Sequence, residues 1–99
     1  MEEDEHRFGG PLDAEEAQAV AALTPDQVKA IDAAILHEVS SRWSKVAMVL
    51  GRQLSARPGI PGDVPLEYYW QRLSLFVDQG LVEVQGDLHR ARYSEVRLS

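Results

Sequence analysis

Apolar residues recur at every third or fourth position along most of the chain, and this spacing predicts a series of amphipathic helices. The clearest helix begins at Pro25, because Thr24 can cap it and Gln27 can return a hydrogen bond to the Thr24 backbone. Its apolar face consists of Val28, Ile31, Ile35 and Val39. The predicted helix spans residues 25–38 and turns its polar face to solvent.

A second helix is predicted to follow, because Ser40 and Ser41 can end the first helix and cap the next one. Helical spacing then relates Trp43, Val46, Ala47, Leu50 and Leu54. A glycine inside a helix costs about 1 kcal/mol relative to alanine. At Gly51, therefore, either this helix weakens or another backbone passes close by.

Residues 57–65 contain three prolines and two glycines, which predicts a loop. A third helix follows over about residues 65–79, with Asp63 as its expected N-cap. Its buried stripe consists of Leu66, Tyr69, Trp70, Leu73, Phe76 and Val77. The aromatic residues expected in the core are Trp43, Tyr69 and Trp70.

Gly80 stands where a left-handed residue commonly ends a helix, and Leu81 can then fold back onto Phe76. Beyond this glycine the apolar period changes from 3.6 to 2, which predicts an antiparallel hairpin. Val82 and Val84 are expected to face Val96 and Leu98 across the two strands. The turn begins at Gly86-Asp87, and residues 88–91 either form a longer loop or continue both strands.

The N-terminal part of the chain differs from the rest in charge. Residues 1–39 hold ten acidic and two basic side chains, a net charge of −8, whereas residues 40–99 hold six acidic and eight basic ones, a net charge of +2. Residues 1–11 combine acids with Gly-Gly-Pro and are predicted to be a flexible acidic tail. A weak helix starts after Asp13, and residues 12–99 are expected to form a single domain.

Composition excludes several classes of protein. The absence of cysteine removes disulfides, thiolate metal sites and cysteine nucleophiles, and it fits a reducing compartment. No stretch approaches the roughly 20 apolar residues of a membrane span, and the acidic N-terminus is unlike a secretory signal. We therefore expect a cytoplasmic protein that does not contact membranes.

Two stretches, RLSLFVDQGLVEVQGD at residues 72–87 and RARYSEVRLS at residues 90–99, resemble the third helix and wing of winged helix-turn-helix proteins. Residues 24–98, including WSKVAMVLG, also resemble a small bacterial family of unknown function. The resemblance implies an α+β, winged-helix-like fold: a three-helix core, a two-stranded antiparallel wing and, here, a short extra N-terminal helix.

The chain departs from the helix-turn-helix pattern in loop length and in charge. The connection RPGIPGDV exceeds the usual three or four residues, and the third helix carries two acids against one arginine. Its outward face instead offers Tyr68, Arg72 and Leu75 as candidate protein contacts, unless the hairpin or the N-terminal segment covers that side. Arg72, Arg90 and Arg92 are the candidate nucleic-acid contacts of the alternative hypothesis.

No catalytic, cofactor or metal site is evident in the sequence. The acidic pairs lack the burial that tunes a catalytic carboxyl group, and His6, His37 and His89 have no metal-ligand spacing. No small-molecule substrate is evident either. The sequence therefore favours a non-catalytic interaction module that contacts a protein partner or a second copy of itself, and the alternative is a DNA-binding regulator.

Overall fold

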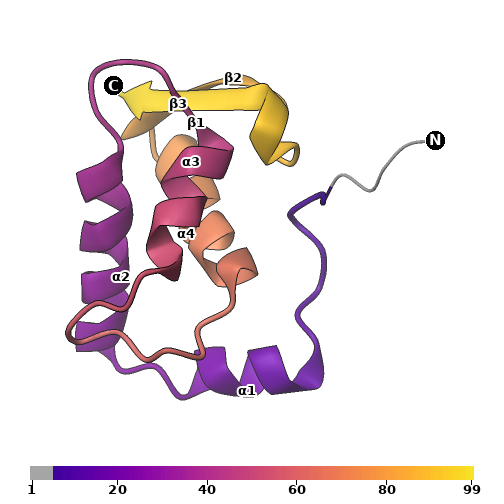
Figure 1. The fold of residues 1–99 in the computed structure, drawn as a ribbon, viewed down its shortest axis with the longest axis vertical. Coiled ribbons are helices and arrows are strands. Elements are labelled where there is room, and N and C mark those ends of the chain that lie inside the picture. Colours follow the sequence, from indigo (N-terminus) through magenta and orange to yellow (C-terminus); the bar gives the residue numbers. More distant parts are fainter. Residues whose placement is uncertain (1–5) are drawn as a thin grey trace.

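Helices cover one side of a small antiparallel sheet in the computed structural model, which describes residues 6–99 (Figure 1). The elements are α1 (Ala14–Ala21), α2 (Pro25–Glu38), β1 (Ser44–Lys45), α3 (Val46–Gly51), the 3-10 turn η1 (Arg52–Leu54), α4 (Leu66–Asp78), β2 (Val82–Gly86), the 3-10 turn η2 (Ala91–Tyr93) and β3 (Ser94–Leu98). The α+β class is therefore confirmed. No helix in residues 6–99 has the length and apolar character needed to cross a bilayer.

The starts of α1 and α2 follow from local capping. In α2 the Gln27 amide donates to Thr24 Oγ1 at 3.2 Å and the Thr24 amide donates to Gln27 Oε1 at 2.9 Å. Asp13 and Glu16 make the equivalent pair of bonds at the start of α1. Each cap satisfies amides that have no partner inside the helix, so the two predicted helix starts are confirmed.

The second predicted helix is wrong in its first part. Ser44 and Lys45 pair with β3 opposite Val96 and Glu95, and α3 begins only at Val46. The Ser40 hydroxyl accepts a bond from the Arg42 amide, so it closes a turn rather than capping a helix. Because the backbone of Ser44 and Lys45 pairs with β3, these residues are not part of the helix.

Gly51 is the last residue of α3, after which the backbone tightens into η1. No atom of another segment lies within 4 Å of a Cβ built at Gly51. Of the two explanations for this glycine, weakening of the helix is therefore the correct one.

The prediction that Asp63 caps α4 is wrong, because Pro65 is the N-cap and no side chain bonds to it. A residue before proline avoids the helical region, which keeps Val64 outside the helix. The predicted end is confirmed: Gly80 has φ +79°, and the amides of Gly80 and Leu81 donate to Val77 O and Phe76 O, each at 3.0 Å. This is the double bond of a Schellman motif.

The predicted hairpin is present, and its register, which the sequence left open, places Val82 opposite Leu98 and Val84 opposite Val96. The sheet, however, has three strands in the order β1-β3-β2, which corrects the expected two-stranded wing. Residues 87–93 form a turn and η2 rather than further strand. Gly86 ends β2 with φ +83°, and a Cβ there would lie 2.5 Å from the Tyr93 carbonyl oxygen.

The core lies between the sheet and helices α2, α3 and α4. Its largest fully buried side chains include Ile31, Ile35, Leu50, Leu73 and Val96. Tyr69 and Trp70 are buried as predicted, but the prediction is wrong for Trp43, which lies outside the core cluster. Alternation along the sheet places Trp43 on the outer face, where the Arg97 guanidinium lies 4.5 Å from the centre of its ring.

Candidate functional site

Residues 6–11, here called the N-terminal strap, lie against both the hairpin turn and α4. The Phe8 amide donates to His89 O at 2.9 Å, and His89 Nδ1 lies 2.8 Å from Phe8 O. The Gly9 amide donates to Glu67 Oε2 at 2.6 Å. The strap therefore lies beside the first turn of α4 and the hairpin turn. Residues 1–5 of the predicted flexible tail lie outside the described residues.

Aromatic contacts hold the strap in place. The Phe8 ring stacks on Trp70 with a centroid distance of 6.3 Å, and His89 lies 4.9 Å from the Trp70 ring. Trp70 Nε1 donates to Leu88 O at 2.9 Å, which ties α4 to the hairpin turn. Gly9 has φ +98°, and a Cβ there would lie 2.5 Å from His89 Nδ1. The backbone of the strap thus lies so close to the His89 ring that only glycine fits at position 9.

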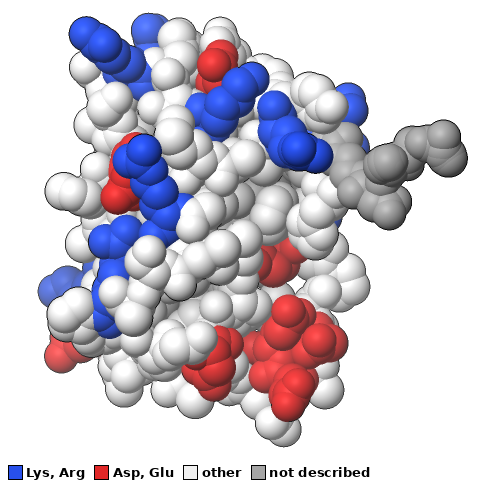
Figure 2. Space-filling model, viewed as in Figure 1, with Lys and Arg blue, Asp and Glu red and all other residues white. Residues whose placement is uncertain are grey.

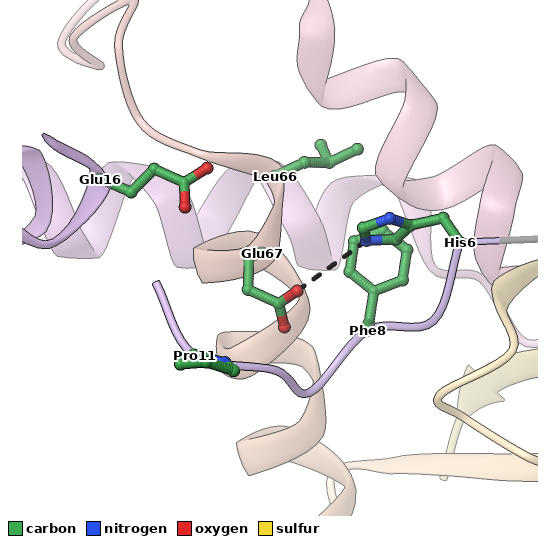
Figure 3. A pocket seen from close by; sticks show the side chains of 6 residues that line it. All are labelled: His6, Phe8, Pro11, Glu16, Leu66 and Glu67. Carbon is green, nitrogen blue, oxygen red and sulfur yellow. Dashed lines mark ion pairs between the residues drawn. The ribbon is translucent and has the colours of Figure 1, made fainter. Parts of the chain in front are cut away.

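A hollow of about 400 Å³ lies between the strap, α1 and α4 (Figure 3). Its lining residues are His6, Phe8, Pro11, Glu16, Leu66 and Glu67. Figure 3 shows His6 and Glu67 facing each other, with 4.0 Å between Nε2 and Oε1, which is too long for a hydrogen bond. None of the six lining residues is a serine, threonine, cysteine or lysine nucleophile. Within the described part of the chain, no three His, Asp or Glu side chains are grouped as a metal site.

Arg72, one of the three predicted protein contacts, is engaged with α2. Its Nε and Nη2 donate to the two carboxylate oxygens of Asp32, each at 2.8 Å. These bonds raise the pKa of the Arg72 guanidinium, and both side chains are half-buried. A bidentate arginine–carboxylate pair fixes geometry as well as charge. Arg72 thus joins two helices and presents little charge outward.

The other two predicted contacts differ in exposure. Tyr68 is half-buried and packs against the core, whereas Leu75 is 36% exposed. Leu81 and Leu98, exposed by 51% and 40%, lie at the open end of the hairpin, where the Ser99 amide donates to Leu81 O. Sequence reasoning singled out Leu75 but missed these two leucines as surface residues. Both leucines belong to an alternating pattern that predicts burial on one face of a sheet. That pattern does not show that no other segment covers them in the fold.

The predicted nucleic-acid contacts lie on separate parts of the molecule. Arg72 belongs to the α2–α4 contact, whereas Arg90 and Arg92 lie at the hairpin turn and η2. The Arg90 guanidinium lies 4.7 Å from the centre of the Tyr93 ring, and Arg92 is exposed. The structure therefore does not combine α4 and the hairpin turn into one basic surface.

Charge is unevenly distributed over the face that carries α3 (Figure 2). Acidic side chains gather at the edge formed by α1, whereas lysines and arginines lie along the sheet and the α3 side. Part of this basic surface is neutralised, because Glu38 lies 3.0 Å from Arg52 Nη1 and 3.5 Å from Arg57 Nη2.

Comparison with known proteins gives no relative for this chain: no family model, no curated protein and no solved structure matches it.

Proposed function

We propose that this chain is a winged-helix-like, non-catalytic module that binds a protein partner or a second copy of itself. Three helices, α2, α3 and α4, pack under a hairpin that follows directly from the glycine at the end of α4. This order is the one implied by the resemblance of residues 72–99 to a third helix and wing. Fold alone does not set function, so the proposal rests on the surface of α4.

The proposal depends on the observation that the single cation of α4 is already paired with a carboxylate. Arg72 is the one lysine or arginine in α4, and both of its carboxylate-directed bonds go to Asp32. Glu67 and Asp78 leave the helix with a net negative charge. The strap also lies on the first turn of α4, through Gly9 and Glu67. A helix that binds DNA needs lysine or arginine side chains that are free to contact phosphates. The surface of α4 instead has the residue types that are typical of protein–protein interfaces.

The proposed contact surface, here called the α4 face, consists of Tyr68, Arg72, Leu75, Leu81 and Leu98. It combines an aromatic ring, three partly exposed leucines and an ion pair that is already formed. Aromatic residues and arginine are enriched in protein interfaces, and burial of leucine against a partner supplies the free energy of association. A preformed Arg72–Asp32 pair spares the entropy of ordering two long side chains on binding.

Sedimentation velocity over a range of concentrations tests self-association, and a pull-down with matched variants tests a protein partner. Leu75→Gln should abolish the signal, because it replaces an exposed apolar side chain of the α4 face by a polar amide that a partner would have to desolvate. Met48→Gln is the matched control, since Met48 is 44% exposed on α3 and lies outside this face. Association that survives Leu75→Gln unchanged would place the interface elsewhere and refute this use of α4.

DNA binding through the hairpin turn is the alternative function, and the exposed Arg92 beside Arg90 favours it. If the turn neutralises phosphates, affinity for mixed duplex DNA should fall by about 0.9 log units per log unit of salt for each contact. Arg92→Gln should then reduce that slope, whereas the exposed control Arg42→Gln should not. Under our proposal the two variants behave alike and binding to DNA stays weak.

A further inference from the structure

The N-terminal strap lies on a surface that is built by segments far from it in the sequence. These segments are α3, α4 and the hairpin turn. The surface, here called the strap site, consists of Leu50, Leu66, Glu67, Trp70, Asp87 and His89. None of these residues belongs to the α4 face, so the two surfaces can be tested separately.

The backbone of the strap is bonded as the backbone of a bound peptide would be. The Phe8 amide donates to His89 O at 2.9 Å, and the Phe8 carbonyl accepts from His89 Nδ1 at 2.8 Å. The Gly9 amide donates to Glu67 Oε2 at 2.6 Å. Main-chain bonds of this kind hold a peptide whatever its side chains are, and side-chain contacts then select its sequence.

The strap site makes specific contacts at three successive positions of the strap. The Arg7 guanidinium lies 3.5 Å from Asp87 Oδ2, and the Phe8 ring stacks on Trp70 with a centroid distance of 6.3 Å. Position 9 has φ +98°, and a Cβ there would lie 2.5 Å from His89 Nδ1, so only glycine fits. The site therefore suits a cation, an aromatic ring and a glycine in succession.

The strap does not fill the site that it occupies. The hollow of about 400 Å³ beside α1 and a second hollow of about 160 Å³ beside α3 and η2 share His6, Phe8 and Leu66 as lining residues. The Phe8 ring borders both hollows and is only half-buried. Apolar walls beside unfilled space lack contacts that a better-fitting segment would make.

The strap resembles a ligand on a tether. The helix α1 links it to the core without burying any residue of its own, and none of residues 6–11 is fully buried either. A flexible tether gives its ligand an effective concentration on the order of millimolar. A competing segment must therefore bind more tightly than the strap, and the two hollows provide room for the additional contacts.

We propose that the strap site binds a short segment of a partner protein in which a cation, a phenylalanine and a glycine follow one another, and that this segment displaces the strap. The carboxylates of Glu67 and Asp87 favour a segment with positive charge. The phenylalanine of the segment takes the place of Phe8, and its glycine takes the place of Gly9. The strap is an intramolecular ligand that excludes weaker segments.

The test is a titration of the ¹⁵N-labelled chain of 99 residues with a blocked synthetic peptide that has the sequence of residues 6–11, followed by NMR. The Phe8→Ala chain has lost the ring that anchors its own strap, so it should bind the peptide with shifts at the Trp70 indole and at Glu67 and His89. The natural chain should bind at least about tenfold more weakly, because its own strap competes.

Altered peptides test the selected positions on the same Phe8→Ala chain. A peptide with Phe8→Ala and a peptide with Gly9→Ala should both lose binding. A peptide with Gly10→Ala is the matched control and should bind as well as the natural sequence, because a Cβ at Gly10 meets no atom within 4 Å. Equal binding of the Gly9→Ala and Gly10→Ala peptides overturns the assignment of the glycine.

Substitutions in the strap site test where the peptide binds. In the Phe8→Ala chain, Glu67→Ala should weaken binding, because the acceptor for the Gly9 amide is lost. Asp78→Ala is the matched control, since it removes an exposed carboxylate from the opposite end of α4. Equal effects of these two substitutions would place the peptide outside the strap site.

The proposal as a whole is overturned if the Phe8→Ala chain shows no shifts in the strap site, or if it binds the peptide no better than the natural chain does. If Phe8→Ala does not fold, the Gly9→Ala chain replaces it, with the Gly10→Ala chain as its control. Dimers of the natural chain that Gly9→Ala removes and Leu75→Gln leaves intact would identify the occupant as the strap of a second copy. That result overturns the assignment of a separate partner.

Discussion

The charged side chains of this protein act mainly through one another. Arg72 bonds to Asp32 and thereby joins α4 to α2, and Arg97 bonds to Glu83 while its guanidinium lies over Trp43. A count of charges along the sequence treats each cation as available to a partner. The structure shows that pairing within the chain decides how much of that charge reaches the surface.

Glu38 makes one such pairing measurable through pH. The hydrogen bond from Arg52 lowers its pKa below the ordinary value of 4.5, so Glu38 stabilises the fold above that pH. This contribution is lost as the pH falls through the lowered pKa of the folded state. We expect Glu38→Gln to be less stable than the natural chain at pH 7, and the difference to shrink as the pH falls below 4.5. Urea unfolding of both proteins over a series of pH values below 7 measures the difference.

Because the glutamine side chain introduced in that variant does not titrate, the substitution removes only the contribution of this one carboxyl group. A difference in stability that does not change with pH would mean that Glu38 acts through packing rather than through its charge.

Some elements begin or end because of interactions between residues close in sequence, and others because of interactions with distant segments. The caps of α1 and α2 involve residues three positions apart. The position of β1 depends instead on β3, which lies near the end of the chain. Local sequence therefore sets the start of α2 and the end of α4 better than it sets the start of α3.

Two glycines with positive φ separate two costs of replacing glycine by alanine: the strain of a left-handed backbone and the collision of the added Cβ with a neighbouring atom. Gly80 has φ +79° with no neighbouring atom within 4 Å of a Cβ, whereas at Gly86 a Cβ would meet the Tyr93 carbonyl at 2.5 Å. Gly80→Ala should cost about 1 kcal/mol of stability, since only the left-handed conformation is penalised. Gly86→Ala should cost at least about 2 kcal/mol, because strain and collision add. Chemical denaturation of both variants measures this order, and equal losses would contradict it.

At the scale of the whole molecule, the strap joins parts that are distant in the sequence. Phe8 and Gly9 contact Trp70, His89 and Glu67, although the intervening helix α1 has no buried residue. The strap is therefore held by its own contacts and not by the helix that follows it.

Phe8→Ala should release the strap without unfolding the core. The ring is half-buried, so we expect a loss of about 1–2 kcal/mol, less than the roughly 3–5 kcal/mol typical of a fully buried phenylalanine. Hydrogen exchange should accelerate at the amides of Phe8 and Gly9 while the amides of α2 remain protected. Pro11→Ala, an exposed change in the same segment, is the control. Unchanged exchange in the strap would show that Phe8 does not anchor it.

Sequence alone determined the features that depend on neighbouring residues: both capping boxes, the glycine stop of α4 and most of the buried stripe. Their hydrogen bonds and apolar spacing act over a few positions, so they can be read directly from the order of residues. Only the tertiary structure decided that Trp43 lies outside the core and that Arg72 is paired with Asp32. Those outcomes depend on which distant segments pack together, because burial and pairing are properties of the neighbours in space.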